Sequence, residues 1–143
     1  MALESAARVM NGTFGQIWED GTEIAEVSAF QLKVTNNFDT LNLCKQMAED
    51  RKLIGVKITG SMTLHKVYTR GADDVEQAMS GHDLRKTLVG KLDDPDAYGA
   101  ERVAAYGVSY DEQTLMDWAA AKSGSITIPF QATGVEYLDK VEA

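Results

Sequence analysis

The feature that most constrains this chain is a long alternation of apolar and polar residues, "KLIGVKITGSMTLHKVYTR" at 52–70. The apolar positions that share one face of the predicted strand are Val56, Ile58, Met62 and Leu64, and the polar positions on the other face are Lys57, Thr59, Ser61, Thr63 and His65. A period of two is typical of a β-strand with one buried face. One face therefore belongs to a core, and the other meets water or a partner.

The length of this strand is as informative as its pattern. Strands average about 5–6 residues, but this alternation runs from Leu53 to Thr69, which spans more than about 50 Å at roughly 3.4 Å per residue. A globular chain of this size has a radius of gyration of about 14 Å and is roughly 40 Å across. We therefore expect the strand either to bend sharply or to project beyond the body of the protein in a long hairpin.

The first strand of that hairpin is predicted just upstream, where Phe30, Leu32 and Val34 alternate with Gln31, Lys33 and Thr35. Before this point the apolar residues shift to odd positions, which predicts a β-bulge near Ser28. The sequence "NNFDTLNLCKQMAEDRK" at 36–52 separates the two strands and is predicted to form the hairpin tip. No active site is visible in the sequence that such a hairpin could cover. The hairpin is suited instead to binding another subunit.

The other segments predict short strands and helices. "TFGQIWEDGTEIAEV" at 13–27 indicates a hairpin, because Asp20-Gly21 is a strong two-residue turn signal. The remaining predicted elements are strands at 84–92, 102–110 and 125–138 and short helices at 71–81 and 114–124. Pro129 removes one donor from the last strand, which predicts a sheet edge or a bulge there.

The second predicted helix, "TLMDWAAAKSG" at 114–124, has an explicit start signal and an apolar side. Thr114 and Asp117 resemble a capping box, with Asp in the position usually held by Glu. The residues expected to face inward are Leu115, Trp118 and Ala119, and Gly124 is expected to end the helix.

Together these elements predict a single, mainly β domain over residues 1–143. We expect an antiparallel β-sandwich or barrel with a long projecting hairpin and one or two short flanking α-helices. Residues 1–12 are polar and without period, and we interpret them as a flexible N-terminal arm. No apolar run approaches the ~20 residues that cross a bilayer, so no membrane partner is expected. The single cysteine, Cys44, cannot form an internal disulfide, which favours synthesis in a reducing cytoplasm.

The best candidate for a metal site is the acidic stretch "DDPDAYGAERVA", which begins at Asp93. An EF-hand needs a ligand at its fifth position and a bidentate Glu at its twelfth. Counting from Asp94, these positions hold Tyr98 and Ala105. We therefore interpret the stretch as an Asp/Pro/Gly turn between two strands.

Other patterns that carry chemistry are also missing from the sequence. His65 and His82 lack the spacing of metal ligands. Cys44 has no histidine close to it in sequence that would make it a nucleophile, and no glycine-rich phosphate loop occurs. The sequence therefore predicts no catalytic residue, no cofactor and no metal.

The charge balance argues against tight binding of nucleic acid. The chain carries 22 acidic and 14 basic residues, a net charge of −8 at pH 7. Wrapping a phosphate backbone needs a clustered basic surface, and no Lys/Arg cluster supplies one. An acidic surface instead disfavours contact with DNA.

Three segments, in this order, carry a resemblance to a known family. They are "NGTFGQIWEDGTEIAEVSAFQLKV", "ITGSMTLHKVYTR" and "KLDDPDAYGAERVAAYGVSYDEQTLMDWAAAKSGSITIPF". They resemble the tail tube proteins of contractile phage tails, in particular the XkdM-like group of PBSX-type prophages and related tailocins. The resemblance covers about residues 10–140.

This resemblance implies a structural protein that assembles with itself rather than an enzyme. Six such subunits form a ring through head-to-tail contacts, and the rings stack into a hollow tube inside a contractile sheath. The implied partners are further copies of the chain and the sheath, baseplate and tail-terminator proteins, while DNA passes through the lumen without specific binding. The protein would be made in the cytoplasm of the bacterial host and reside in the virion tail.

The resemblance and the hairpin together give two sets of expected site residues. The tip at 36–52 and the arm at 1–12 are expected to make ring-to-ring contacts. The tip residues expected at the ring-stacking interface are Phe38, Leu41, Leu43, Lys45, Met47 and Arg51. The residues expected to line the lumen are Lys33, Thr35, Lys57, Thr59, Ser61 and Thr63.

From the residues alone, two other classes of protein stay open. A small β-barrel ligand-binding module would need an apolar interior larger than its core fills, and it would be a stable monomer. A small hydrolase or isomerase would need a catalytic motif, and none supports it.

Overall fold

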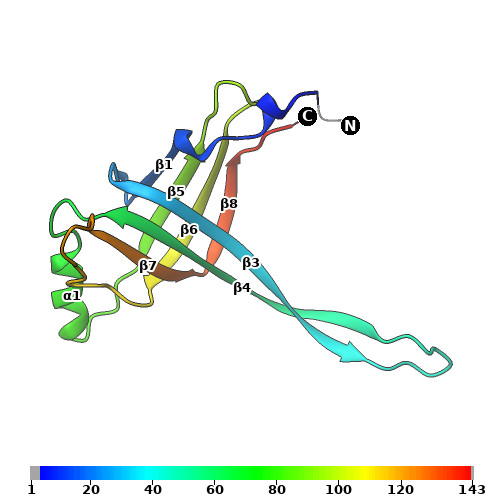
Figure 1. The fold of residues 1–143 in the computed structure, drawn as a ribbon. Helices are drawn as coiled ribbons and strands as arrows, with labels where there is room; N and C mark the ends of the chain where they lie inside the picture. The colour runs from blue at the N-terminus through cyan, green and yellow to red at the C-terminus, as the bar shows by residue number, and fades with distance from the viewer. Residues whose placement is uncertain (1–3, 143) are drawn as a thin grey trace.

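The computed structural model describes residues 4–142, and their fold is mainly β (Figure 1). The strands are β1 (Gly15–Glu19), β2 (Thr22–Glu23), β3 (Val27–Leu41), β4 (Asp50–His65), β5 (Lys86–Leu92), β6 (Glu101–Tyr110), β7 (Ser125–Ala132) and β8 (Gly134–Asp139). The helices are α1 (Ala72–Met79) and two 3₁₀ turns, η1 (Ala6–Arg8) and η2 (Gly12–Phe14). Within the described residues, no helix is long and apolar enough to cross a bilayer.

All strand pairs are antiparallel and follow one path, β2-β1-β5-β6-β7-β4-β3, with β8 paired to β6 beside β7. The path folds over into two layers. One layer contains β2, β1, β5, β6 and β8, and the other contains β3, β4, β7 and the last residues of β6. The predicted sandwich with a long projecting hairpin is confirmed (Figure 1).

The two layers join at a corner formed by Gly107 and Thr133. Before the corner β6 pairs with β8, and after it Ser109 and Tyr110 pair with β7. Gly107 has a φ of +61°, and a Cβ at this position would overlap the Thr133 hydroxyl. The strand predicted at 125–138 is therefore divided at Thr133 into β7 and β8, because the sheet changes direction there.

The core lies between the two layers as two adjacent clusters. One contains Leu88, Val108 and Phe130, and the other contains Ile17 and Met62. Phe30 packs against both clusters and stacks on Phe130 with ring centroids 6.0 Å apart. Of the residues predicted to share the core face of the long strand, Ile58, Met62 and Leu64 are buried, and Ile128, Phe130 and Ala132 of β7 are buried beside them.

Several local predictions are also confirmed. The Asp20-Gly21 turn joins β1 to β2, with positive φ at both residues. The register between β3 and β4 shifts between Val27 and Ala29, where the bulge was expected. The helix predicted at 71–81 forms as α1, with two acidic residues in its first turn, where they favour the positive end of the helix dipole.

The helix predicted at 114–124 is wrong. The segment has no regular structure, and Leu115 and Trp118, which were expected to face inward, are exposed. A helix of this length is marginal on its own and needs a surface against which to pack its apolar side. No other part of residues 4–142 covers this side, because Leu115 and Trp118 remain accessible to solvent.

Pro129 does not lie on an edge strand, since β7 is paired with β4 on one side and with β6 on the other. The Pro129 carbonyl accepts a hydrogen bond from the Asp111 amide at 2.9 Å. Asp111 lies just beyond the end of β6. The backbone N–H that proline lacks would point toward this place, where the pairing of β6 with β7 has ended, so its absence breaks no hydrogen bond between the strands.

The acidic stretch after β5 forms the predicted turn and holds the N-terminal segment. The buried Asp94 carboxylate accepts hydrogen bonds from the backbone amides of Asn11 at 2.8 Å and Asp96 at 2.9 Å. The Arg8 guanidinium donates to the Asp96 carbonyl at 3.1 Å. Of the predicted arm, residues 4–12 therefore contact this turn, and residues 1–3 lie outside the described residues.

Candidate assembly surface

The most unusual surface of the molecule is the outer part of the β3–β4 hairpin. The ladder runs from Val27↔Leu64 to Leu41↔Asp50, but β7 accompanies β4 only as far as the Ile58↔Ala132 pair. Residues 35–57 therefore project from the body as a two-stranded ribbon, here called the extension (Figure 1). The loop at its tip covers only 42–49 and is shorter than the predicted 36–52, because strand pairing continues to Leu41 and Asp50.

The polar residues predicted to line a lumen share one face of this hairpin. Directly paired residues point to the same side of an antiparallel ladder. The pairs are Lys33↔Thr59, Thr35↔Lys57, Gln31↔Ser61 and Ala29↔Thr63. The Thr63 hydroxyl also lies 3.2 Å from the Thr127 hydroxyl of β7. The structure brings all six predicted residues together, and their place in a lumen stays a prediction.

The charge on this polar face differs from the charge of the whole chain. We consider the residues on this face at positions 31, 33 and 35 of β3, 57, 59, 61 and 63 of β4, and 127, 129 and 131 of β7. The charged side chains among them are Lys33 and Lys57. The remaining positions are mostly hydroxyl or amide side chains. The acidic excess of the chain is therefore located elsewhere, so this face does not repel DNA through acidic groups.

The opposite face of the hairpin is largely apolar, although Asn36, Thr40 and Arg51 also lie on it. Inside the body it presents Phe30 and Ile58 to the core. It continues through residues that are exposed: Val34 at the edge of the body, and Phe38, Leu53, Ile54 and Val56 on the extension. The sequence placed Val56 on the core face, but it is 55% exposed, because the body has ended by that position.

The residues predicted for ring stacking are distributed over the extension rather than gathered at its tip. Phe38 and Arg51 lie on the ladder, and the Arg51 guanidinium sits 4.0 Å from the centroid of the Phe38 ring. Leu41 ends β3, and Leu43, Lys45 and Met47 lie in the tip loop. All six are exposed, and their role in stacking stays a prediction.

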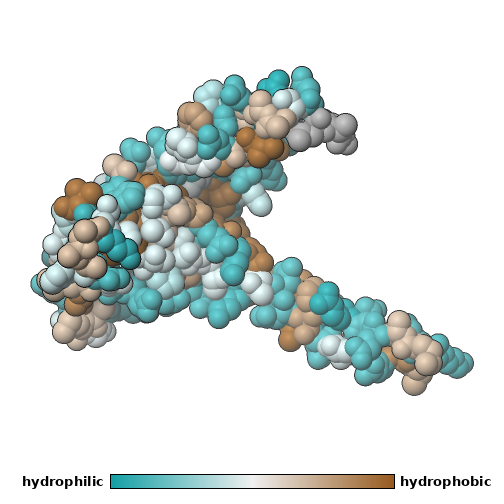
Figure 2. Space-filling model, viewed as in Figure 1, coloured by the Kyte–Doolittle hydropathy of each residue, from teal (hydrophilic) through white to brown (hydrophobic). Residues whose placement is uncertain are grey.

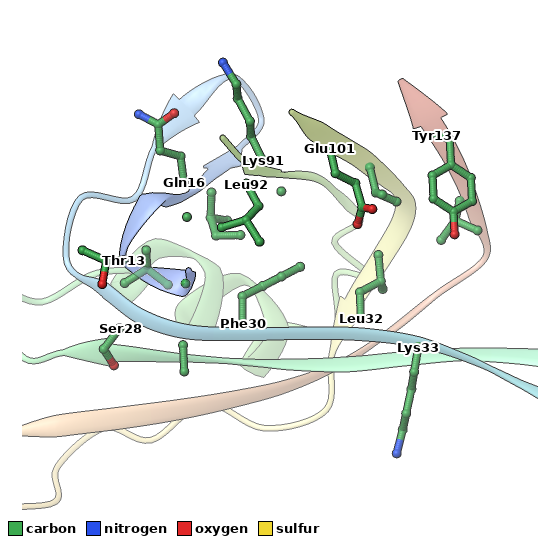
Figure 3. A pocket seen from close by; sticks show the side chains of 18 of the residues that line it. Thr13, Gln16, Ser28, Phe30, Leu32, Lys33, Lys91, Leu92, Glu101 and Tyr137 are labelled. Atoms are coloured by element: carbon green, nitrogen blue, oxygen red, sulfur yellow. The ribbon is translucent and has the colours of Figure 1, made fainter. Parts of the chain in front are cut away.

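A cleft of about 830 Å³ opens between β3 and the other layer, on the side from which the extension projects. Phe30 and Leu32 point into it from β3, while Lys33 points away toward the polar face (Figure 3). Its opposite wall includes Glu101 and Tyr137. Figure 2 shows the same place as a deep notch with apolar surface on its inner wall. Within residues 4–142, both β3 and β8 have one edge without a partner strand, so the two layers do not close around this cleft.

At the other end of the body, an ionic cluster fixes α1 to the sheet. The Lys86 ammonium lies 2.9 Å from Asp74 of α1 and 3.1 Å from Glu19 of β1. Burial alone would lower the pKa of Lys86, but its hydrogen bonds to Asp74 and Glu19 outweigh this effect and the pKa is raised. The Tyr110 hydroxyl donates to Glu19 at 2.7 Å, and burial, together with that carboxylate, raises the Tyr110 pKa.

A second ion pair fixes the segment before α1. The Arg70 guanidinium donates two hydrogen bonds to the Glu26 carboxylate, and both side chains are largely buried. Burial raises the pKa of Glu26, but the hydrogen bonds from Arg70 outweigh it, so the pKa is lowered. Neither cluster was found from the sequence, because their members lie far apart in the chain and carry no local motif.

The same end of the body carries a second apolar surface that sequence reasoning missed. The loop between β6 and β7, residues 111–124, is here called the end loop. Its residues Leu115, Met116 and Trp118 are 64%, 80% and 80% exposed. In Figure 1 this loop, in yellow to orange, lies beside α1, at the opposite end of the molecule from the extension. The molecule thus has exposed apolar surfaces at both ends.

The sequence is similar to a known protein family and to two curated proteins. A family model described as "Phage tail tube protein" matches residues 3–139. The phage-like element PBSX protein XkdM of Bacillus subtilis (strain 168) is 31% identical over 117 residues, which cover 80% of this chain and 79% of that protein. An uncharacterized protein of the same organism, YqbM, matches with the same identity and coverage.

Chains in solved structures of phage-like particles have a similar fold. A chain in the cap that terminates the tube of the anti-feeding prophage superposes with a TM-score of 0.66 and 10% identity, covering 98% of this chain and 95% of that one. A chain in the anti-feeding prophage baseplate gives a TM-score of 0.61 at 7% identity, covering 87% and 90%. A chain in the virion of a native gene transfer agent gives 0.56 at 13% identity, covering 92% and 100%.

Proposed function

Because the chain belongs to the phage tail tube protein family, a family of structural proteins, we propose that it assembles into six-subunit rings that stack into the inner tube of a phage or phage-like contractile tail. The observation that carries this proposal is the extension. It is a two-stranded ribbon, and isolated ribbons of this kind are marginally stable at best in water. Its apolar face and its open edges gain partners only when other subunits are present.

The layer that contains the long hairpin has the properties that a tube wall needs. It contains β3, β4, β7 and the end of β6, with an apolar face toward the core and a hydroxyl-rich face outward. Among the strands that the structure describes, none pairs with the outer edge of β3. Exposed edges of this length readily add a further strand, so neighbouring subunits can extend the sheet around a ring. The polar face, with Lys33, Thr35, Lys57, Thr59, Ser61 and Thr63, would then line the lumen.

The lumen proposed here would conduct DNA without specific binding. Its wall presents hydroxyls, amides and the ammonium groups of Lys33 and Lys57, and the described residues that pair across it on this face include no Phe, Tyr or Trp on which a base could stack. The other partners would be the sheath, baseplate and tail-terminator proteins. This part of the proposal is supported by similarity to chains found in a baseplate and in a tube-terminating cap. Synthesis would take place in the bacterial cytoplasm before assembly into the tail particle.

Negative-stain electron microscopy of the purified protein over a concentration series tests this function. We expect six-fold rings at low concentration and hollow tubes at high concentration, with an outer diameter that does not depend on tube length. Six-fold averaging of end-on views gives the number of subunits directly. Uniform particles of the size of one subunit at every concentration would contradict the proposal.

A further inference from the structure

The end loop displays an unusually apolar surface for a monomer. Leu115, Met116 and Trp118 lie within four consecutive positions and are each at least 64% exposed. Exposed apolar patches of this kind mark interaction sites, and tryptophan is among the residues most enriched at the energetic centre of interfaces. Nothing in the described part of the chain covers these side chains.

The loop is anchored at both ends, so it is presented in a defined place. The Asp111 amide donates to the Pro129 carbonyl at 2.9 Å, and the Lys66 amide donates to the Gly124 carbonyl at 2.8 Å. Gln113 lies against Gly71, at the beginning of α1. The exposed residues between these anchors therefore form the outer surface of the α1 end of the body.

The opposite end of the molecule provides a hollow of matching character. The cleft is lined by Phe30, Leu32 and Val34, and its apolar floor continues onto the extension at Phe38. Figure 2 shows this hollow as a notch between the body and the extension. One end of the molecule is thus convex and apolar, and the other is concave and apolar.

The balance of charge differs between the two surfaces. The end loop is acidic on balance, with Asp111, Glu112 and Asp117 against Lys122. The extension is slightly basic, with Lys45, Arg51, Lys52 and Lys57 against Asp39, Glu49 and Asp50. On the apolar face of the extension, Arg51 forms no ion pair with any residue of 4–142, and its guanidinium lies over Phe38. A second copy whose end loop entered the notch would bring these acidic groups to the base of the extension, and Arg51 lies on the same face farther out.

We propose that the end loop of one subunit seats in the notch between the body and the extension of a subunit in the adjacent ring. This inference rests on the tube function proposed above, and it adds the pair of surfaces through which adjacent rings contact each other. Two complementary surfaces at opposite ends of one chain make a heterologous contact, which repeats along an axis without closing. The contact would bury Trp118 and the apolar floor of the notch together.

Cysteine cross-linking in assembled tubes tests this contact. The native thiol is first removed with Cys44→Ser, and Met116→Cys is then combined with Val34→Cys, which places one thiol in the end loop and one in the notch. Mild oxidation of tubes should give a ladder of covalent chains on a non-reducing gel that extends well beyond six subunits. The matched control combines Val34→Cys with Met79→Cys, at an α1 position that is 83% exposed and outside the loop, and it should not cross-link.

A second variant tests the same contact without new bonds. Trp118→Ala should leave the melting temperature of the monomer unchanged, because the side chain contacts solvent, and it should raise the protein concentration needed for tubes at least tenfold while rings still form. Met79→Ala should change neither quantity.

The possible outcomes separate the two proposals. If the wild-type protein forms neither rings nor tubes, the tube function itself fails. If tubes form but the Met116–Val34 pair does not cross-link, or the control pair cross-links equally well, the seating of the end loop is wrong and the tube function stands. A ladder that stops at six subunits would place the contact within one ring and would overturn the stacking geometry proposed here.

Discussion

The body and the extension are built from the same two strands but differ in what covers them. In the body, the apolar face of β3 and β4 meets a second layer, and residues such as Ile58 and Met62 are buried. In the extension the alternation continues, but Val56 and Phe38 stay exposed. The same sequence pattern therefore stabilises the fold in one region and leaves a surface for assembly in the other.

Removing the extension should separate these two roles most completely. Thr35 and Lys57 are directly paired, so residues 36–56 can be replaced by Asn-Gly, a sequence that favours a two-residue hairpin turn. We expect a folded monomer with nearly unchanged melting temperature and a complete loss of tubes in electron micrographs. Long tubes formed by this variant would show that the extension is not needed for stacking.

Truncating one aromatic residue in each region should give opposite results. Phe130 is fully buried, so Phe130→Ala should lower the free energy of unfolding by about 3–5 kcal/mol. Phe38 is exposed on the extension, so Phe38→Ala should change the unfolding free energy by only about 0.5 kcal/mol or less. Urea denaturation of the two monomers measures both values, and a similar loss for both would end the distinction between the regions.

The corner at Gly107 should be the most sensitive backbone position in the body. Gly107→Ala places a side chain at positive φ and against Thr133, which should cost about 2 kcal/mol or more of unfolding free energy. Combining it with Thr133→Ala should recover only part of the loss, because the contact is relieved and the φ remains unfavourable. Full recovery in the double variant would show that backbone conformation contributes nothing.

The smallest expected effect in the body depends on pH. The pKa of Glu26 is lowered in the folded state, so its pairing with Arg70 stabilises the fold above the unfolded pKa near 4.5 and is lost as pH falls through the folded value. Glu26→Gln should therefore reduce the melting temperature at pH 7, and the difference from wild type should shrink steadily below about pH 4.5. A difference that stays constant from pH 7 to pH 3 would argue that the carboxylate charge is irrelevant. The extension should not respond to this change.

The fold was largely predictable from its alternating strands, because burial of one face repeats every second residue wherever a core is present. Alternation does not show where the body ends, so Val56 was expected in the core. The helix expected at 114–124 failed for a related reason: Leu115 and Trp118 have helical spacing, but helices this short need a packing surface, and the described chain offers none.

The sequence predicted which residues share the polar face of the hairpin, but it predicted neither the cleft nor the ionic cluster at Lys86. Cross-strand register brings Lys33 together with Thr59, as period-two reasoning expects. The cleft and the Lys86 cluster depend on how distant segments meet. Lys86 and Asp74 are close in space only because α1 packs against the sheet near the β1–β2 turn. No local sequence pattern predicts this packing.

The alternation along the extension also affects how such a protein changes over generations. Odd and even positions supply different surfaces, so substitutions at positions such as Thr35 and Lys57 alter one surface and leave the apolar one intact. Inserting a single residue would exchange the two surfaces from that point outward. Viable changes in length should therefore add an even number of residues to each strand, unless a bulge absorbs the odd one, as the register shift between Asn37 and Phe38 already does.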